Sequence, residues 1–595
     1  MASQAQVQQY LAKPSHYSLT YRTEETPRYE HQQAINSLNA KARELGYPLK
    51  KAHASTLIVL GSGLGFHLEH LLSVTINNNS TYSNIILVEP DNDMLFHFLC
   101  TIDIDKLSAH CQQNGGVFTI LQPKSAANFT EQVSKIVQQV GYGLFSEMGF
   151  YRHYETPLFN DIFDNIKSIR HKWLSTWGFF GDEMISLNHS LANARAHQRF
   201  YLGLEKGGSN KEGKKKLAKS NPILIVGNGP SLDGDIELLK THHQQFTLIS
   251  CGSALPVLLK LGIMPDIHVE MERTAALFDL VEPSLTADFC QNTLLIALNT
   301  VAPKLISSFK RSLLFTKAND LGAMVLKPDN QETIQGLYFS NPTVTNLAVS
   351  ACIALGFEHF VMLGCDYGYK DPERHHASTS EYYNPKSMIA GTKFSNELVV
   401  PGNFGGVVGT ERIFNLSRTN IEQLLIRNPQ VNCINCADGA LIKGAEPLRF
   451  EQYLSARSSS KSTSNKSKHT LDELLPLADF ERLNIDEALL SATLNRCIDY
   501  ISEFAQALKQ PLNAKTLKQL LTTLTFDLDT QKHRTPEFFL LSGVTRYFSV
   551  SINGHLGRIP TDNAPDYVCY AAERLAAFCD DCLKTLTDLL TNKTD

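Results

Sequence analysis

An apolar run that ends in a glycine-rich turn lies near the middle of this chain. Residues 222–232 read Pro-Ile-Leu-Ile-Val-Gly-Asn-Gly-Pro-Ser-Leu. The apolar part predicts a buried strand, and the change to Gly, Asn and Pro predicts a tight turn leading into a helix. Backbone N–H groups at such a helix start favour anions. The residues we expect to hold a ligand there are Gly227, Asn228, Gly229, Pro230 and Ser231, with an ordinary turn that binds nothing as the alternative.

The pattern after this turn alternates strands with helical segments. The predicted strands are 223–226, 246–250, 266–271, 294–298, 312–316 and 359–363. This alternation predicts a doubly wound α/β domain with a mainly parallel sheet covered on both faces. Ligands bind such sheets beyond the carboxyl ends of the strands. The polar or glycine residues at these ends are Gly252, Ser253, Glu270, Asn299, Asp366 and Tyr367.

Two further segments carry candidate site residues. A helix is predicted from about 343 to 355, and Thr343 or Thr345, with Asn346 close by, has the chemistry to cap it and orient its N–H groups toward a carboxylate or phosphate. A long irregular loop follows Asp366 and contains His375 and His376. Residues 399–409 resemble a hairpin. Long loops in compact domains are often functional, so we expect this loop to contribute to the site.

A second glycine turn lies near the N-terminus. Residues 54–65 predict a strand that enters the turn containing Gly61, Gly63 and Gly65, and a second strand ends at Glu89. This βαβ unit resembles the nucleotide-binding turn of class I methyltransferases, in which the acidic residue bonds the ribose. No methyl-transfer signature follows, so a purely structural Rossmann-like domain is favoured.

Composition divides the chain into three expected domains. Residues 206–219 are rich in Gly and Lys, and residues 455–469 are rich in Ser and Lys, as in linkers. Helical spacing of apolar residues from 157 to 203, including Phe200, predicts a helical bridge, and the same spacing from Leu471, including Phe480, predicts a helix bundle. The expected domains are a Rossmann-like domain with its bridge at 1–205, a central domain at 221–454 and the bundle at 470–595.

Charge and cysteine content narrow the range of partners. With 55 Lys and Arg against 60 Asp and Glu, the net charge is −5, so the composition favours neither nucleic acid nor a membrane surface. The first residues lack the pattern of a secretory signal. Twelve scattered cysteines are typical of reduced thiols in a cytoplasmic protein. Two C-x-x-C pairs, Cys433/Cys436 and Cys579/Cys582, have no matching second pair nearby, and we expect no zinc site.

Five motifs of the central domain resemble the motility accessory factor (Maf) family of bacterial flagellin glycosyltransferases. They occur in family order at residues 227–232, 265–270, 342–345, 363–366 and 438–445. The resemblance implies transfer of a nonulosonic acid, of the pseudaminic or legionaminic type, from its CMP conjugate to Ser or Thr of flagellin. It also implies a role in flagellar assembly and motility.

The central domain is also similar to bacterial sialyltransferases. Asn228 and Tyr367 fall on positions that hold CMP-sialic acid in those enzymes, whereas Gly252 stands where they have asparagine. Their catalytic-histidine segment has no counterpart here. The resemblance to Maf sequences implies His376 as the acid/base candidate, with neighbouring His375 as second choice and Asp366 as a further candidate.

The sequence leaves three functions open. A CMP-sugar carries only a single phosphate to screen, so no cofactor or metal is required. The expected donor and acceptor are a CMP-nonulosonic acid and flagellin. One alternative is a pyrophosphokinase acting on a pterin, which needs clustered carboxylates for magnesium. The other is a flagellin-binding chaperone without catalytic activity.

Overall fold

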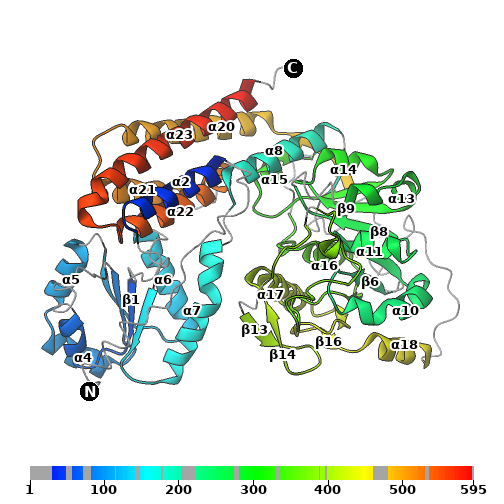
Figure 1. Ribbon diagram of the computed structural model, residues 1–595, viewed down its shortest axis with the longest axis horizontal. Helices are drawn as coiled ribbons and strands as arrows, with labels where there is room; N and C mark the ends of the chain where they lie inside the picture. Colours follow the sequence, from blue (N-terminus) through cyan, green and yellow to red (C-terminus); the bar gives the residue numbers. More distant parts are fainter. Residues whose placement is uncertain are drawn as a thin grey trace. The chain divides into compact units, whose positions relative to one another are not determined.

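The structure is a computed structural model that describes sixteen stretches of the chain. They are residues 30–47, 56–71, 82, 84–113, 116–140, 148–175, 178–196, 198–202, 222–273, 281–328, 334, 336–387, 389–394, 398–459, 480–529 and 535–591. The chain forms two compact units, one of residues 1–183 with 491–595 and one of residues 184–490. Both units contain a parallel sheet, and helices follow at the C-terminus (Figure 1), which confirms the predicted fold class.

The first unit contains a four-stranded parallel sheet in the order β3-β2-β1-β4. Its strands are β1 (Thr56–Leu60), β2 (Asn84–Val88), β3 (Phe118–Leu121) and β4 (Met148–Arg152). Figure 1 shows α4 (Asn92–Thr101) and α5 (Ile104–Gln113) on one side of β1, with α6 (Ala126–Val140) and α7 (Pro157–Ser175) on the other. Every residue of β1 and β2 is buried, as expected for strands covered on both faces.

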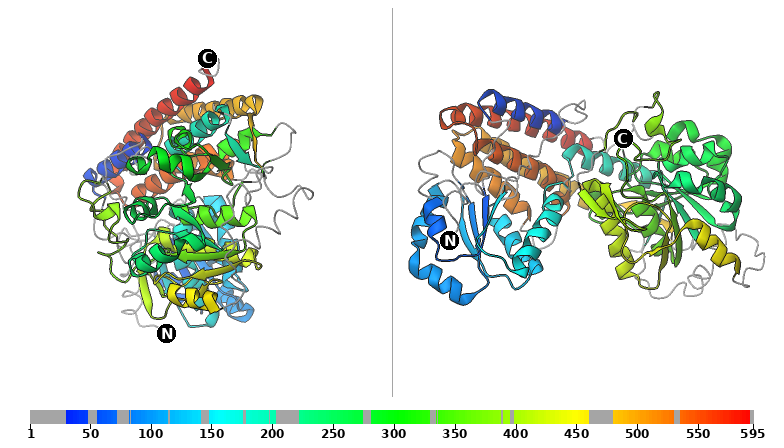
Figure 2. Two further views of the ribbon diagram at one scale, coloured as in Figure 1. Left: turned by 90° about the vertical axis from the view of Figure 1, so that its right-hand side faces the viewer. Right: turned by 60° about the horizontal axis from the view of Figure 1, so that its bottom comes forward.

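The remaining helices of this unit come from both ends of the chain. They are α2 (Glu30–Glu44), α20 (Glu487–Leu508, whose first residues belong to the second unit), α21 (Ala514–Asp529), α22 (Pro536–Leu556) and α23 (Ala564–Thr591). The N-terminal helix α2 packs against α22 and α23 (Figure 2). The C-terminal helices therefore share a core with the N-terminal part, which is why contacts group the chain into two units and not into three successive domains.

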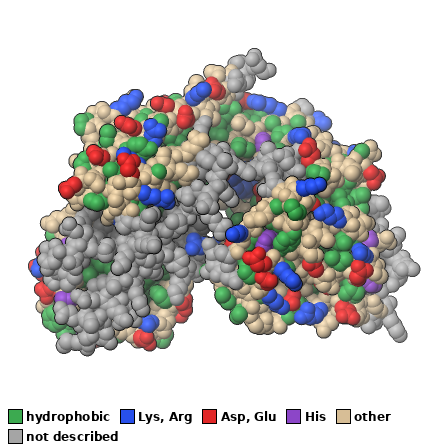
Figure 3. All heavy atoms as spheres, in the orientation of Figure 1, with side chains coloured by type: hydrophobic (Ala, Val, Ile, Leu, Met, Phe, Trp, Pro, Cys, Tyr) green, Lys and Arg blue, Asp and Glu red, His purple; other side chains and the backbone are tan. Residues whose placement is uncertain are grey.

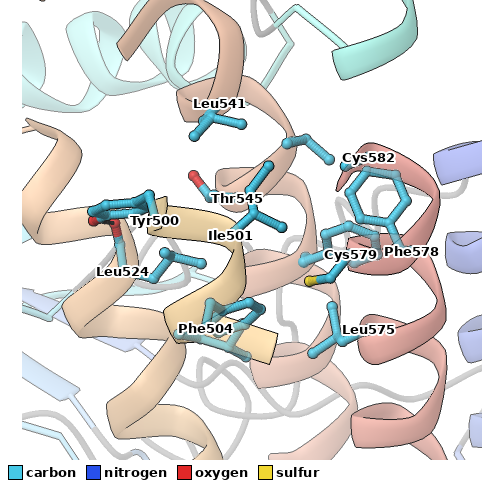
Figure 4. A pocket seen from close by; sticks show the side chains of 13 residues that line it. Tyr500, Ile501, Phe504, Leu524, Leu541, Thr545, Leu575, Phe578, Cys579 and Cys582 are labelled. Carbon is cyan, nitrogen blue, oxygen red and sulfur yellow. Dashed lines mark hydrogen bonds between the residues drawn. The ribbon is translucent and has the colours of Figure 1, made fainter. Parts of the chain in front are cut away.

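The C-terminal helices enclose an apolar cavity (Figure 4). Aromatic, aliphatic and thiol side chains of α20 to α23 line it, among them Phe504, Leu575 and Phe578. Cys579 and Cys582, three residues apart on α23, both line this cavity. Burial raises the pKa of the Cys579 thiol to about 12, so this cysteine acts as a small apolar side chain.

The second unit contains a ten-stranded sheet. Its order is β16-β15-β12-β6-β7-β8-β9-β10-β5-β17, and the edge strand β17 is antiparallel to β5. The strands are β5 (Arg199–Tyr201), β6 (Ile223–Val226), β7 (Thr247–Cys251), β8 (Ile267–Glu270), β9 (Leu294–Leu298), β10 (Ser312–Phe315), β12 (His359–Leu363), β15 (Asn432–Asn435), β16 (Glu446–Pro447) and β17 (Phe480–Arg482). From β6 the chain adds β7, β8, β9 and β10 on one side and later β12, β15 and β16 on the other, so the boundary between β6 and β12 is the topological switch point.

Helices cover both faces of the large sheet. They are α8 (Phe180–Arg195), α10 (Leu232–His242), α11 (Ala254–Lys260), α13 (Ala287–Asn292), α14 (Pro303–Ser308), α15 (Leu321–Val325), α16 (Val344–Leu355), α17 (Arg412–Arg427) and α18 (Phe450–Ser459). Successive residues of β6 enter different cores: Ile223 and Ile225 pack in the cluster that contains α16, whereas Leu224 and Val226 pack in the cluster with α10 and α18. This is the two-sided burial that the apolar run predicted.

Two local predictions are wrong. Phe200 lies in strand β5 and not in a helix, because it and Tyr201 pack within an aromatic cluster that includes Phe315. Phe480 begins β17, which closes the same edge of the sheet, so the C-terminal helices start only at Glu487.

Cys433 of the first C-x-x-C pair lies in β15, and Cys436 follows this strand directly. Three of the four residues of β15 are buried, because this strand lies between β12 and β16 and is covered on both sides. The predicted linker at 455–469 begins as the end of α18, and its remainder lies outside the described residues, as does the predicted linker at 206–219. The predicted hairpin is confirmed as β13 (Leu398–Pro401) and β14 (Val407–Thr410), and a second small pair joins β11 (Leu326–Lys327) to β18 (Asn484–Ile485).

The surface in Figure 3 carries Lys and Arg interspersed with Asp and Glu. Among the described residues seen in Figure 3, no large field of one sign gathers, which agrees with the net charge of −5. Among the described residues, none of the helices combines the length and the apolar character that crossing a bilayer requires.

Replacing Leu575 by Ala tests the apolar cavity. Leu575 is 1% exposed and already borders empty space. The substitution therefore enlarges a cavity that its neighbours cannot fill, and we expect a loss of about 2–5 kcal/mol in the free energy of unfolding. Chemical denaturation followed by circular dichroism measures this change. An equal loss for Leu583→Ala, on the same helix but not lining the cavity, would contradict the explanation.

Candidate functional site

The glycine turn after β6 lies against the turn after β12, at the switch point of the large sheet. Gly227 N donates to Leu363 O (2.9 Å), and Gly229 N donates to Gly364 O (2.7 Å). A Cβ atom on Gly227 would lie 2.5 Å from Gly364 O, and one on Gly229 would collide with the carboxylate of Asp366. These glycines therefore allow two backbone turns to meet. The sequence had suggested a different role for them, which is to make room for a ligand.

Asp366 is held in this contact by the neighbouring turn. Ser231 Oγ donates to Asp366 Oδ2 (2.9 Å), and this hydroxyl makes no capping bond to α10. Asp366 is 4% exposed. Burial raises the pKa of its carboxyl to about 7, although the bonds from Ser231 oppose this rise. Asp366 thus exchanges a proton near neutral pH.

Asn228 connects three strand ends. Its Nδ2 donates to Ser253 Oγ (3.0 Å), which follows β7, and to Ser380 Oγ (2.8 Å), in the loop after β12. Its backbone oxygen accepts from Ala377 N (3.0 Å). No described residue donates to its buried Oδ1 atom. Pro230 follows in the same turn and is half-buried.

The loop that contains the histidines is fastened to this turn at further points. Ser378 N donates to both carboxylate oxygens of Asp233 (3.0 Å each), at the start of α10. Lys260 Nζ, at the end of α11, bonds the carboxylate of Glu381 (2.6 Å). The loop is thus held on both sides of Ser380, and the two histidines lie just before the first anchor.

His375 and His376 lie in an aromatic cluster. The Nδ1 atoms of the two rings are 2.5 Å apart, so one of them donates a hydrogen to the other. His376 stacks on Tyr382 with ring centroids 3.8 Å apart, and His375 contacts Phe394 at 4.1 Å. Burial, followed by the neighbouring imidazole, lowers the pKa of His376 to about 3, and burial lowers the pKa of His375. Both rings are neutral at pH 7.

Two glutamates mark the end of β8. Glu270 is buried, and its Oε2 accepts from Met271 N (3.2 Å), while Oε1 lies 3.6 Å from Nε2 of the buried His268. Gly252, with φ of +48°, lies near this carboxylate. Burial, reinforced by Glu270, raises the pKa of Glu272 to about 7.

The start of α16 is a closed hydrogen-bond network. Thr343 N donates to Asn346 Oδ1 (3.2 Å), and Asn346 Nδ2 donates to Ser417 O (2.9 Å). Tyr367, with φ of +50°, donates from its hydroxyl to Thr345 Oγ1 (2.8 Å). The predicted cap is confirmed, and Tyr367 links the helix start to the turn that carries Asp366.

Asn299 lies apart from this group. Its Nδ2 donates to Ser190 Oγ (2.7 Å) and Asp320 Oδ2 (2.8 Å), and its Oδ1 accepts from Lys317 N (2.9 Å). Both polar atoms of the fully buried Asn299 side chain are therefore hydrogen-bonded within the protein. In the structure, Asn299 thus joins secondary-structure elements. From the sequence alone, a polar residue after a strand could serve either this purpose or ligand binding.

Sequence reasoning missed two residues of the site. Ser380 and Tyr382 lie in the long loop and contact Asn228 and His376, respectively. Glu272, which the sequence places among the polar residues after the third predicted strand, lies two residues beyond the end of β8. The Ser380–Glu-Tyr-Tyr383 segment combines a hydroxyl with adjacent aromatic residues, but only the fold shows which of them face the site. Within the described stretches, no group of three His, Cys, Asp or Glu is suited to hold a metal.

Comparisons with known proteins agree with this architecture. Residues 1–172 match the family described as glycosyltransferase Maf N-terminal domain. Residues 204–372 match the family described as 6-hydroxymethylpterin diphosphokinase MptE-like. The solved structure of the Maf glycosyltransferase from Magnetospirillum magneticum AMB-1 is 22% identical, covers 99% of this chain and 90% of its own, and has a TM-score of 0.65.

A curated relative covers a much shorter stretch. An uncharacterized protein from Treponema pallidum (strain Nichols) is 37% identical over 49 residues, which are 8% of this chain. The chain spans about a quarter of that relative's length, since the match covers 23% of it.

The fold defines an α/β protein with a doubly wound sheet, and the candidate site lies at the switch point of that sheet. Within that class, the chain has a Maf N-terminal domain and, over nearly its whole length, the fold of a Maf glycosyltransferase. The predicted resemblance to the Maf family is confirmed.

Replacing Asp366 by Asn tests the buried carboxyl. The native carboxyl keeps its proton up to about pH 7, whereas the unfolded carboxyl loses it near pH 4. The contribution of Asp366 to the free energy of unfolding is therefore fully present below pH 4 and is lost as the pH rises through 7. We expect the wild-type free energy of unfolding to fall by a few kcal/mol relative to Asp366→Asn between pH 4 and 8, at about 1.4 kcal/mol per pKa unit. Denaturant titrations of both proteins across this range measure the difference, and parallel curves would contradict it.

Proposed function

We propose that this chain transfers a nonulosonic acid, of the pseudaminic or legionaminic type, from its CMP conjugate to Ser or Thr hydroxyls of flagellin in the cytoplasm. The observation that carries the proposal is the double attachment of the histidine loop to the glycine turn through Asn228. Both the backbone oxygen and the side-chain amide of Asn228 bond this loop. A ligand at the turn would therefore lie beside His376, at the strand edge where α/β folds bind nucleotides.

The reaction places defined demands on the site. The bond between the anomeric carbon and a phosphate oxygen breaks, and its electron pair leaves with CMP. A Ser or Thr oxygen bonds to that carbon, and its proton passes to a base. The transition state is oxocarbenium-like, with negative charge growing on the phosphate, and a hydrogen-bond donor must stabilise this leaving group. The proposed donor is the backbone N–H of Asn228. Gly229 N already bonds Gly364 O, Pro230 has no N–H, and the Ser231 backbone bonds Asp366.

His376 is the proposed base, with His375 and Asp366 as the other candidates. A neutral imidazole accepts a proton, but a pKa of about 3 makes His376 by itself a weak base. The phosphate and the sugar carboxylate would bring negative charge beside the ring and raise its pKa toward the working range. The helix start at Thr343, Thr345 and Asn346, together with Tyr367, is the proposed contact for the donor.

A pterin diphosphokinase activity is the second candidate. The match of residues 204–372 to the MptE-like family favours it. Such an enzyme transfers diphosphate from ATP and releases AMP. A chaperone that binds flagellin without turnover is the third candidate, and it differs from both enzymes in releasing no nucleotide.

Incubation of the full chain with CMP-nonulosonate and flagellin tests these candidates. We expect free CMP and a mass gain on flagellin of one nonulosonic acid residue. Asn228→Ala should raise the KM for the donor and lower kcat, because it frees the loop from the turn. His376→Ala should lower kcat by about 10²–10⁴-fold with a smaller effect on donor KM.

His359→Ala is the matched control for the histidine variant. His359 is exposed at the opposite end of β12, so its loss should leave transfer unchanged. AMP release from ATP with a pterin acceptor would support the second candidate. Fully glycosylated filaments in a strain that carries His376→Ala would remove this residue from the mechanism.

A further inference from the structure

The glycine turn of the N-terminal sheet is filled by the chain's own side chains. Gly61 and Gly63 have φ of +98° and +48°. A Cβ on Gly61 would lie 2.5 Å from the ring of Tyr154, and one on Gly63 would lie 2.7 Å from Cδ2 of His153. Both aromatic residues follow β4. The space that the backbone of such a turn leaves for a nucleotide is therefore occupied.

The acidic residue at the end of β2 is fully engaged as well. Glu89 is fully buried, and its Oε2 accepts from Ser62 N (2.8 Å) and Ser62 Oγ (2.9 Å). Its Oε1 accepts from Asp91 N (3.0 Å), and the Tyr154 hydroxyl lies within 2.8 Å of both oxygens. In nucleotide-binding proteins with a similar turn, the corresponding carboxylate bonds a ribose. In this chain, the carboxylate of Glu89 holds Tyr154 instead.

The same edge of the sheet carries large exposed apolar side chains. We call them the α4 patch: Leu64 (45% exposed), Phe66 (53%), Phe96 (63%) and Leu99 (48%). Leu64 belongs to the turn, Phe66 begins the helix at 66–71 that follows it, and the last two belong to α4. Thr101 Oγ1 donates to Leu64 O (2.7 Å), and Ser62 Oγ lies 3.4 Å from Met94 O, so the turn is bonded to the helix.

Acidic residues surround the α4 patch. Asp91 and Asp93 lie at the start of α4, and Asp103 and Asp105 lie just beyond its end, all four exposed. Lys106 is the exposed cation beside them. Exposed apolar groups of this size within a charged rim are typical of protein interaction sites. An acidic rim favours a partner that carries basic residues.

We propose that the N-terminal sheet has exchanged nucleotide binding for polypeptide binding, and that the α4 patch docks a segment of the acceptor protein with apolar side chains flanked by Lys or Arg. Phe96 and Leu99, three residues apart on α4, form a stripe that an apolar helix face or extended segment can cover. The identity of this partner as the acceptor rests on the proposed function.

Substitutions in the α4 patch test this docking in the full-length chain. Phe96→Asp and Leu99→Asp should each raise the KM for flagellin about tenfold, since they place charge in the apolar contact. CMP release from the donor without flagellin, and the KM for the donor, should not change. Asp93→Asn with Asp105→Asn should raise the flagellin KM a few-fold at low salt and less at high salt.

Ile426→Asp is the matched control. Ile426 is 65% exposed on α17 of the second unit, and its substitution should leave all parameters unchanged. Wild-type flagellin KM in Phe96→Asp would overturn the proposal. So would a wild-type dimer in light scattering that Phe96→Asp converts to a monomer, because a second copy would then occupy the patch.

Two measurements separate a failure of the docking hypothesis from a failure of the proposed transfer activity. If the wild-type chain releases no CMP, the proposed function fails, and calorimetric titration with flagellin still measures the docking. If that titration gives the same affinity for wild type and Phe96→Asp, the docking fails whatever the activity.

Discussion

The close approach of two backbone turns at the switch point is the constraint on which the candidate site depends. Gly227 and Gly229 meet Gly364 and Asp366 so closely that no side chain fits between them. Parallel strands on both sides of β6 bring their carboxyl ends to this crevice, and the hydrogen bonds between the turns fix their separation. Any larger residue at these glycines would push Asp366 out of its contact with Ser231 and open the crevice.

From this contact the site extends outward through Asn228. One asparagine bonds Ser253 after β7 and Ser380 beyond β12, and its backbone bonds Ala377. The loop is long, yet these bonds, with Asp233 and Lys260, give it a defined position. The same closeness buries several titratable groups with few compensating charges, which moves the pKa values of Asp366 and Glu272 toward 7 and that of His376 downward.

The two glycine turns of the chain show how similar sequence signals lead to different sites. Both follow a buried strand and precede a helix. At the N-terminal turn, His153 and Tyr154 fill the space beside the glycines, and Glu89 bonds Tyr154. At the central turn, the chain's own backbone fills the space beside the glycines, while Asn228 retains a buried oxygen to which no described residue donates. Residues distant in sequence decide which turn remains suited to a ligand.

The sequence by itself determined the elements whose signals are local. The strands at 223–226, 294–298 and 359–363, the hairpin and the cap of α16 were predicted because apolar runs, glycines and capping residues act on their nearest neighbours. Only the tertiary structure decided that Phe200 and Phe480 join one sheet, that Asn299 is used within the core, and that Ser380 and Tyr382 face the histidines. These outcomes depend on pairing and packing between segments far apart in the chain. The types and spacing of neighbouring residues do not show which distant segments will meet.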